Sequence, residues 1–348
     1  MDAVTPMSRE IPGSADPVKA VSVISTGDGA APDVLLLGAA GSSGRLVAAE
    51  LVARGLTVRL AGRRAGPLEE LALALADGGA STEVSPVDLT DPASLAEAIA
   101  DVGVVVSTVG PFARHGGRVI EACLAASTPY VDIANEWSAV RGLLDRDDQA
   151  RAAAVVLVTG AGFGPAATEI LVLGLVARLG GVPAGVRVAS AAQVTQRGDG
   201  VRETIQEALS EGAVTYRDGR VVREPLGSGA TVLTFGGAER RMVPAPVGDL
   251  EAARRASGAA DVVAYVADPS SPGAGTGSCA WAEVVSPGGR IAVAELVAGD
   301  GLHATAAIAA ETTRRVLAGV APGAWTAARL LGTDVVTAAA GARVTVDG

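Results

Sequence analysis

Residues 33–45, Asp-Val-Leu-Leu-Leu-Gly-Ala-Ala-Gly-Ser-Ser-Gly-Arg, decide the fold of the first half of the chain. A short apolar run leads into Gly38, Gly41 and Gly44, which are spaced by three residues. Glycine at these places lets a strand turn sharply, lets the backbone approach a ligand closely, and lets the next helix pack tightly on the sheet. The segment therefore predicts a strand, a tight turn and a helix that together bind a diphosphate.

The helix expected over 42–54 would point its unpaired N–H groups and its positive dipole end at that diphosphate. The hydroxyls of Ser42 and Ser43 can donate further hydrogen bonds, and Arg45 either assists or is solvated. Three glycines alone are a weak signal in a chain that has 45 of them, so the flanking strand and helix carry the interpretation. The predicted diphosphate contacts are Gly38, Ala40, Gly41, Ser42, Ser43 and Gly44.

The next apolar strand, over 57–61, ends in Gly62-Arg63-Arg64. An NAD-binding domain usually has an acidic residue about 20 positions after the glycines, where it hydrogen-bonds the ribose. Two arginines at this place instead favour the 2′-phosphate of NADP(H), because guanidinium groups bind phosphate in a bidentate manner. The alternative for Arg63 and Arg64 is an exposed charged turn.

Apolar strands and amphipathic helical stretches alternate from residue 33 to about residue 160. Asp91 and Pro92 form a helix start, with aspartate as the N-cap and proline at the first helical position. Short valine-rich strands with helices between them predict a parallel sheet covered on both faces, a doubly wound Rossmann domain. The strands are expected over 33–37, 57–61, 81–84, 103–107, 129–133 and 154–158, and the helices over 42–54, 66–77, 91–100, 116–127 and 137–152.

The pattern changes after residue 164, where strand-like segments joined by turns follow one helix. The expected helices cover 166–180 and 303–319, and the strands lie around 186–194, 214–223, 230–236, 261–267 and 290–298, with a hairpin turn at 217–220. The predicted fold class is α/β: a Rossmann doubly wound parallel sheet plus a second α+β sheet domain. The expected divisions are a disordered leader over 1–32, the NADP-binding domain over 33–164, a substrate or dimerisation domain over 165–300, and a C-terminal helix and tail over 301–348 that return toward the Rossmann domain.

Composition excludes several classes of function. The chain has 348 residues and a formal net charge of −10 without a basic tract, which argues against a nucleic-acid partner. Its single lysine, Lys19, lies in the predicted leader, so a Schiff base and a Walker-type lysine are disfavoured. His115 and His303 are the two histidines, and no cluster has metal-ligand spacing, so no metal is expected. Cys123 and Cys279 are expected to be buried thiols in the cytoplasm, and no apolar stretch is long enough for a membrane span.

Ligands of doubly wound sheets bind across the carboxyl ends of the strands, which brings further loops to the site. The segment of Ser107, Thr108, Val109, Gly110 and Pro111 follows the fourth strand and would border the nicotinamide ribose. Asp88 and Leu89 follow the third strand and would approach the adenine, while Asp132 ends the fifth strand and 160–165 follows the sixth.

The chain resembles the saccharopine dehydrogenase-like NADP-binding family, which includes the trans-acting enoyl reductases. The resemblance rests on the segments 38–45, 107–112 and 129–132, and continues at 162–164, 248–250 and 322–332. It implies an NADPH-dependent oxidoreductase whose sheet domain shapes the substrate pocket and often mediates formation of a homodimer. One departure is that Gly164-Pro165 follows Phe163, where the enoyl reductases usually carry an Asp-Ser pair.

Hydride donation leaves a negative charge on the acceptor, so a proton source is required. His115, just after Gly-Pro-Phe, and Asp132 are the candidate catalytic residues; a helix cap or solvent-exposed residue and a turn cap are the respective alternatives. The expected function is an NADPH-dependent reductase of a polarised C=C or C=N bond of a small-molecule substrate in secondary or lipid metabolism. The alternatives are a cyclase or isomerase on the same scaffold without net redox turnover, and a non-catalytic NADP(H) sensor.

Overall fold

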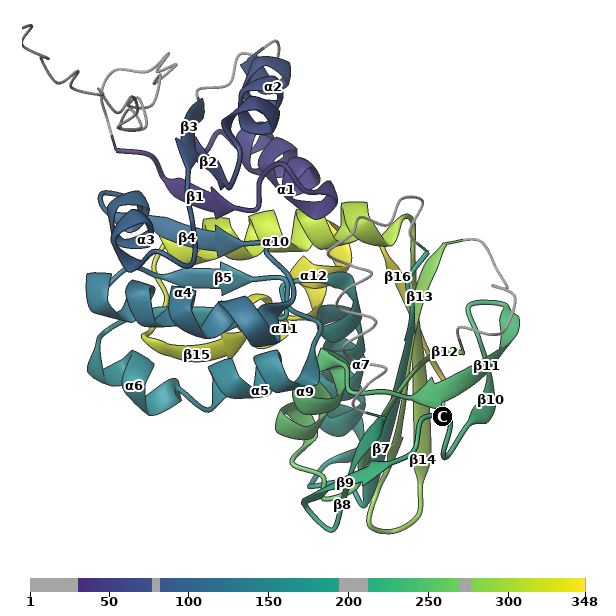
Figure 1. Cartoon of the computed structure of the whole chain (residues 1–348). Coiled ribbons are helices and arrows are strands. Elements are labelled where there is room, and N and C mark those ends of the chain that lie inside the picture. Colours follow the sequence, from purple (N-terminus) through teal and green to yellow (C-terminus); the bar gives the residue numbers. More distant parts are fainter. Residues whose placement is uncertain (1–30, 77–81, 194–211, 269–276, 348) are drawn as a thin grey trace, which may run out of the picture.

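The computed structural model describes residues 31–76, 82–193, 212–268 and 277–347 and contains two sheets (Figure 1). The first is a seven-stranded parallel sheet in the order β15-β6-β5-β4-β1-β2-β3. The six predicted strands of the Rossmann domain are confirmed, and the predicted fold class is confirmed with them. The strands are β1 (Val34–Leu37), β2 (Val58–Gly62), β3 (Thr82–Pro86), β4 (Val104–Ser107), β5 (Tyr130–Asp132), β6 (Val156–Thr159) and β15 (Gly323–Thr326).

Helices cover both faces of this sheet because its strands are apolar on both sides. In β1, Val34 and Leu36 belong to one buried cluster while Leu35 and Leu37 belong to another. The first cluster includes residues of α1 (Ser42–Ala53), α2 (Ala65–Ala76) and α10 (Gly301–Leu317). The second includes residues of α3 (Pro92–Ile99), α4 (Phe112–Ala126), α5 (Trp137–Leu144) and α6 (Asp147–Ala152). The core is therefore split into two layers by the sheet.

Helix starts follow local chemistry where a capping residue is present. The Asp91 carboxylate accepts the N–H of Ala93 at 3.0 Å, which confirms the predicted cap of α3. The helix expected over 137–152 is instead two helices, since α5 ends at Leu144 and α6 begins at Asp147. Asp147 and Asp148 lie in the first turn of α6, where acidic side chains stabilise a helix N-terminus. This favours a new helix start over continuation.

The second sheet is mixed and runs in the order β10-β11-β12-β7-β13-β14-β16, with β8 beside β12 and β9. The hairpin predicted at Arg217–Arg220 is confirmed, and Asp218 and Gly219 take the positive φ values of 50° and 73° that such a turn requires. The strands are β7 (Gly185–Ala191), β8 (Ala213–Arg217), β9 (Arg220–Glu224), β10 (Thr231–Phe235), β11 (Ala238–Pro244), β12 (Val262–Ala267), β13 (Ser278–Val285), β14 (Ile291–Ala298) and β16 (Arg343–Asp347).

Two helices, α7 (Phe163–Leu179) and α9 (Gly248–Ser257), lie against this second sheet. Figure 1 shows α7 between the two sheets, where it also contacts α10, α11 (Ala327–Leu331) and α12 (Thr333–Ala339). One buried cluster accordingly spans both sheets. The C-terminal segment contributes to both, since β15 pairs with β6 and β16 pairs with β14.

One sequence prediction falls mostly on a part of the chain that the structure does not describe. The leader predicted over 1–32 lies outside the described residues except for residues 31 and 32. Among the described residues, both cysteines are buried, as predicted. In the same residues, every helix is too short or too polar to cross a membrane.

Glu169 on α7 is fully buried and links that helix to the first sheet. Its Oε1 accepts a hydrogen bond from the Thr326 hydroxyl at 2.8 Å, while Oε2 has no hydrogen-bond partner among the described residues. Burial raises the pKa of Glu169 from 4.5 to about 8, so the carboxyl is protonated at neutral pH.

We expect Glu169 to make the stability of the protein fall as the pH rises from about 4.5 to about 8. Its folded pKa lies above its unfolded pKa, so its contribution is complete below pH 4.5 and is lost as pH rises through about 8. Glu169→Gln, which stays neutral, should match the wild type near pH 4 and exceed it at pH 9.5 by a few kcal/mol, on the order set by the shift. Urea unfolding at both pH values measures this difference. Equal pH dependence in the two proteins would contradict it.

Candidate dinucleotide site

The glycine turn after β1 is closed in a way that leaves no room for side chains at two positions. Gly38 has a φ of 80°, and a Cβ there would lie 2.7 Å from the Thr108 hydroxyl oxygen. A Cβ at Gly44 would lie 2.1 Å from the Gly38 carbonyl oxygen and 2.8 Å from the Cα of Ala39. The turn therefore depends on glycine at both ends, as the sequence predicted on steric grounds.

The N-terminus of α1 lies at this turn with its backbone donors available. Its N-cap, Gly41, is exposed and gives no side-chain cap, and Ser42 and Ser43 in the first turn are half-buried. The Arg45 guanidinium donates to the Ala40 carbonyl at 3.1 Å, so it braces the turn. An anion placed here would accept hydrogen bonds from backbone N–H groups that donate to no described side chain.

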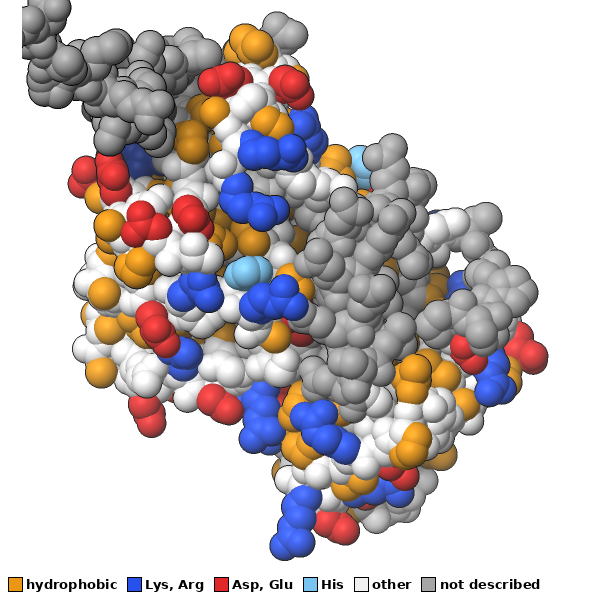
Figure 2. Space-filling model, in the orientation of Figure 1, with side chains coloured by type: hydrophobic (Ala, Val, Ile, Leu, Met, Phe, Trp, Pro, Cys, Tyr) orange, Lys and Arg blue, Asp and Glu red, His pale blue; other side chains and the backbone are white. Residues whose placement is uncertain are grey.

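Arg63 and Arg64 lie between the last residue of β2 and the first residue of α2, and both are exposed. Asp88, after β3, is also exposed and accepts the Thr90 N–H at 2.8 Å and the Thr90 hydroxyl at 2.7 Å. Those two bonds, with smaller contributions from the Arg118 and Arg63 charges, lower the pKa of Asp88. Figure 2 shows cationic side chains interspersed with acidic ones on the Rossmann part of the molecule, whose net charge is −10. The local charge at this edge suits a phosphorylated ligand.

The loop from β4 to α4 packs directly on the glycine turn. Thr108 donates its N–H to the Leu37 carbonyl at 2.9 Å, and its hydroxyl lies 3.0 Å from that oxygen and 3.2 Å from the Gly38 oxygen. Ser107 is buried at the end of β4, Val109 is half-buried, and the Gly110–Pro111 peptide is cis. Thr108 therefore positions the glycine turn through its side chain, so a ligand would meet the loop backbone.

Glu136 caps α4 and was not identified from the sequence. Its carboxylate accepts the N–H of Phe112 at 2.8 Å and the N–H of Ala113 at 2.5 Å, and the residue is 6% exposed. This cap explains why α4 begins at Phe112, earlier than the expected residue 116. The contact joins residues 23 and 24 positions apart, so no local sequence pattern indicates it.

We expect Glu136→Ala to destabilise the protein by about 1–3 kcal/mol, because it leaves the buried N–H of Phe112 and the partly buried N–H of Ala113 without an acceptor. Glu136→Gln, which retains one acceptor oxygen, should cost less. Urea unfolding measures both, and Glu121→Ala on the exposed side of α4 is the control, with an expected change of about 0.5 kcal/mol or less. A Glu136→Ala variant as stable as the control would refute the capping role.

The two candidate catalytic residues occupy different environments. Asp132 is buried, and its Oδ1 accepts from the Thr159 hydroxyl at 2.7 Å and from the N–H groups of Ala134 at 3.0 Å and Gly160 at 3.2 Å. Burial raises the pKa of Asp132 to about 6 against the lowering effect of these donors. Asp132 thus joins the ends of β5 and β6. His115 is half-buried on the first turns of α4 and lies outside the set of described residues that line the cavity beside Asp132.

The second half of the chain meets the Rossmann domain next to these residues. The Gly248 N–H donates to the Asn135 carbonyl at 3.0 Å, and the Trp137 N–H donates to the Pro246 carbonyl at 2.9 Å. A Cβ at Gly164 would lie 3.2 Å from the Asp249 carboxylate. The segments 162–164 and 248–250, far apart in the sequence, are therefore neighbours beside the ends of β5 and β6.

The sheet order, the glycine turn and the bare helix N-terminus define a dinucleotide-binding α/β domain. Residues 34–158 match the family model described as the saccharopine dehydrogenase NADP binding domain. The match confirms the predicted resemblance over this segment and confirms a nicotinamide dinucleotide, of the NADP type, as the cofactor class.

Curated relatives are similar to a part of the chain. A trans-acting enoyl reductase of Mycobacterium tuberculosis (strain H37Rv) is 36% identical over 115 residues, which is 32% of this chain and 28% of that protein. A trans-acting enoyl reductase of Mycobacterium leprae is 30% identical over 150 residues, 42% of this chain and 36% of that protein. The chain thus aligns with about a third of the length of these relatives.

The solved structure of apo saccharopine dehydrogenase (L-Glu forming) from Saccharomyces cerevisiae resembles most of the chain. The two superpose with a TM-score of 0.64 at 14% identity, covering 91% of this chain and 100% of that one. This likeness shows a shared fold that extends through the second sheet.

Proposed function

We propose that the protein is an NADPH-dependent reductase. The observation that carries the proposal is the uncapped N-terminus of α1 behind the Gly38–Gly44 turn, with Arg63 and Arg64 exposed at the end of β2. The match to an NADP-binding domain supports it. The diphosphate would lie on the first turn of α1, and the two guanidinium groups would bind the 2′-phosphate.

The remaining predicted contacts are proposed on the same basis. The β4–α4 loop, from Ser107 to Pro111, would border the nicotinamide ribose through its backbone, and Asp88 and Leu89 would border the adenine side. When bound, NADPH supplies a hydride. The chain's own residues hold the cofactor and must deliver a proton to the acceptor atom.

For that acceptor we propose a polarised double bond, C=C conjugated to a carbonyl or C=N, in a small molecule of secondary or lipid metabolism. The names of the relatives support the reductase class. His115 is the proposed proton donor, since it follows the loop that borders the nicotinamide. Asp132, buried and tied to three donors, is the second candidate and also fits a positioning role.

The proposal also covers the domain organisation of the protein, its location and its oligomeric state. We propose a Rossmann domain over 33–164, a substrate or dimerisation domain over 165–300, and a C-terminal segment over 301–348 that contributes β15 to the first sheet. Two buried free thiols support a reducing, cytoplasmic location. A homodimer through the second sheet domain completes the proposal.

The test is cofactor binding followed by turnover. Calorimetric titration should give tighter binding of NADPH than of NADH, and NADPH absorbance should then decrease with enones or imines as acceptors. Absence of NADPH binding would exclude the reductase. Product formation without net NADPH consumption would instead identify a cyclase or isomerase.

A further inference from the structure

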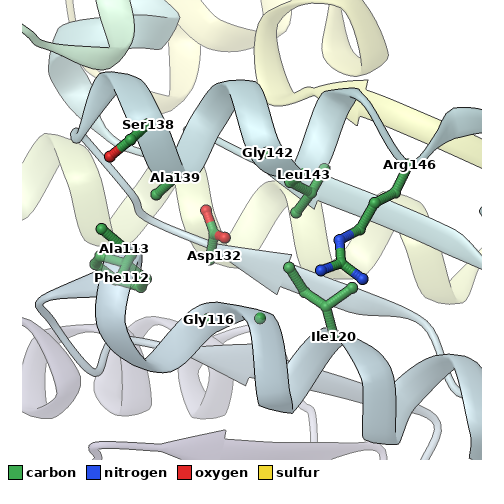
Figure 3. Close-up of a pocket in the computed structure, with 11 residues that line it drawn as sticks. Phe112, Ala113, Gly116, Ile120, Asp132, Ser138, Ala139, Gly142, Leu143 and Arg146 are labelled. Atoms are coloured by element: carbon green, nitrogen blue, oxygen red, sulfur yellow. The ribbon is translucent and has the colours of Figure 1, made fainter.

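A cavity of about 180 Å³ lies between α4 and α5, on the sheet face that α3 to α6 cover. Phe112, Ile120 and Leu143 form apolar parts of its wall. Figure 3 shows Asp132 between the two helices and Arg146, which follows α5, reaching toward the same space. The predicted dinucleotide contacts end at Pro111 and are absent from the described lining, so this cavity is separate from them.

The cavity exists because α4 carries a glycine where it faces the opening. Gly116 is buried, yet a Cβ added there would meet no atom within 4 Å. No neighbouring element therefore lies so close to α4 that only glycine would fit at this position. A glycine inside a helix costs about 1 kcal/mol relative to alanine, so this one lowers helix stability while keeping a space open beside Asp132.

The polar end of the cavity is acidic. Ala134, Thr159 and Gly160 donate to Asp132 Oδ1, and the buried Tyr130 hydroxyl also acts on this carboxyl. A carboxylate has about four acceptor positions, so Oδ2 retains capacity for a hydrogen bond from a ligand. Thr159 and the backbone of Ala134 and Gly160 hold the carboxylate in place. A preorganised, buried carboxylate selects a group that brings its own positive charge or its own donors.

The rim of the cavity is basic. The Arg146 guanidinium lies 3.4 Å from Glu121 Oε1, but Glu121 is 68% exposed, and an exposed pair of this kind is weak. The Nη2 of Arg146 also lies 3.9 Å from the position of a Cβ on Gly117, at the cavity wall. Arg146 is therefore free to exchange its solvent-exposed partner for an anionic group of a ligand in the cavity.

We propose that this cavity binds a small zwitterion, with its protonated amine at Asp132 and its acidic group at Arg146. A simple cation would be repelled at the rim and a simple anion at the base, whereas a molecule with both charges is matched at each end. A cavity of roughly 150 Å³ holds benzene, and this cavity is slightly larger, so its ligand would have only a few more atoms than benzene. The cavity includes Asp132, the second proton-donor candidate of the proposed reductase, but binding of a zwitterion is measured without turnover, so the two proposals can fail independently.

The test is a calorimetric or saturation-transfer NMR titration of the full chain with L-alanine and β-alanine, with and without NADPH. We expect saturable binding with a Kd on the order of 1 mM, in keeping with so small a ligand. Ethylamine and propionate, which each carry one of the two charges, should bind at least tenfold more weakly. Equal binding of ethylamine, or no saturable binding of either zwitterion, would overturn the proposal.

Two matched pairs of variants assign the binding to this cavity. Gly116→Leu fills it and should abolish binding, whereas Gly174→Leu places the same side chain at an exposed position of α7 and should leave binding unchanged. Arg146→Gln should weaken binding at least tenfold, and Arg141→Gln, on α5 beside Trp137, should not. If Gly116→Leu fails to fold, the Arg146 pair decides alone. Wild-type affinity in both Gly116→Leu and Arg146→Gln would place the ligand elsewhere.

Discussion

Gly44→Ala should abolish dinucleotide binding and destabilise the protein by about 3 kcal/mol or more, the upper range for overpacking. The added Cβ would lie 2.1 Å from the Gly38 carbonyl oxygen, and backbone atoms cannot rotate away as a flexible side chain can. Relief requires α1 to move off the strand, which opens the turn and displaces the N–H groups that face the diphosphate. Fluorescence titration with NADPH and thermal unfolding measure the two effects.

Gly66→Ala is the matched control for this substitution. Gly66 lies in α2, the helix that connects β2 to β3, where a Cβ would meet no atom within 4 Å. Alanine there should leave NADPH affinity unchanged and keep or slightly raise stability. A Gly44→Ala protein that binds NADPH as tightly as this control would show that the turn does not hold the cofactor.

Replacing both Arg63 and Arg64 with serine should weaken NADPH binding by about 100-fold and leave NADH binding within about threefold. Each charge-assisted hydrogen bond to a phosphate contributes roughly 1.5–3 kcal/mol, discounted here because both side chains are exposed, and every 1.4 kcal/mol is about tenfold. NADH lacks the 2′-phosphate, so it loses none of these bonds. Calorimetry with both nucleotides gives the ratio of the two Kd values.

Arg220→Ser provides the charge control for the double variant, because Arg220 is exposed on β9 of the second sheet. It removes one positive charge far from the predicted 2′-phosphate position and should change neither affinity by more than about twofold. A parallel loss of NADPH and NADH binding in the arginine variant would point to general disruption of the turn. Unchanged NADPH binding would assign the two arginines to a solvated turn.

Much of the Rossmann half could be predicted because its signals are local. The glycine spacing follows from steric limits within a few residues, and Asp91 caps α3 through a bond to a residue two positions away. Period and composition likewise placed six parallel strands to within about two residues. The strands predicted for the second half omit β11, β13 and β16. β16 pairs with β14 from a distant part of the sequence, which no local pattern indicates. β11 and β13 instead form hairpins with the predicted strands β10 and β14, across Gly236-Gly237 and across residues 286–290, so local turn signals for them are present in the sequence.

The candidate site divides in the same way. The glycine turn and the paired arginines each lie where a strand ends and a helix begins. The residues around each of them are therefore close in sequence as well as in space. Glu136 could not be found in this way, because its partners at Phe112 and Ala113 reach it only after β5 has been laid beside β4. The cavity beside Asp132 forms between two helices that pack on one sheet face. A glycine in the sequence of one helix does not indicate whether an empty space will lie beside it.

The sequence by itself determined the βαβ unit, the dinucleotide class and the side of the sheet on which the cofactor is expected, because backbone sterics and hydrophobic periodicity act over short separations. Tertiary structure alone decided that β15 returns to extend the first sheet, that Glu136 caps α4, and that Glu169 becomes a neutral buried acid. Those outcomes depend on burial and on contacts between distant segments, and the free energy of either is set only when the whole core has formed.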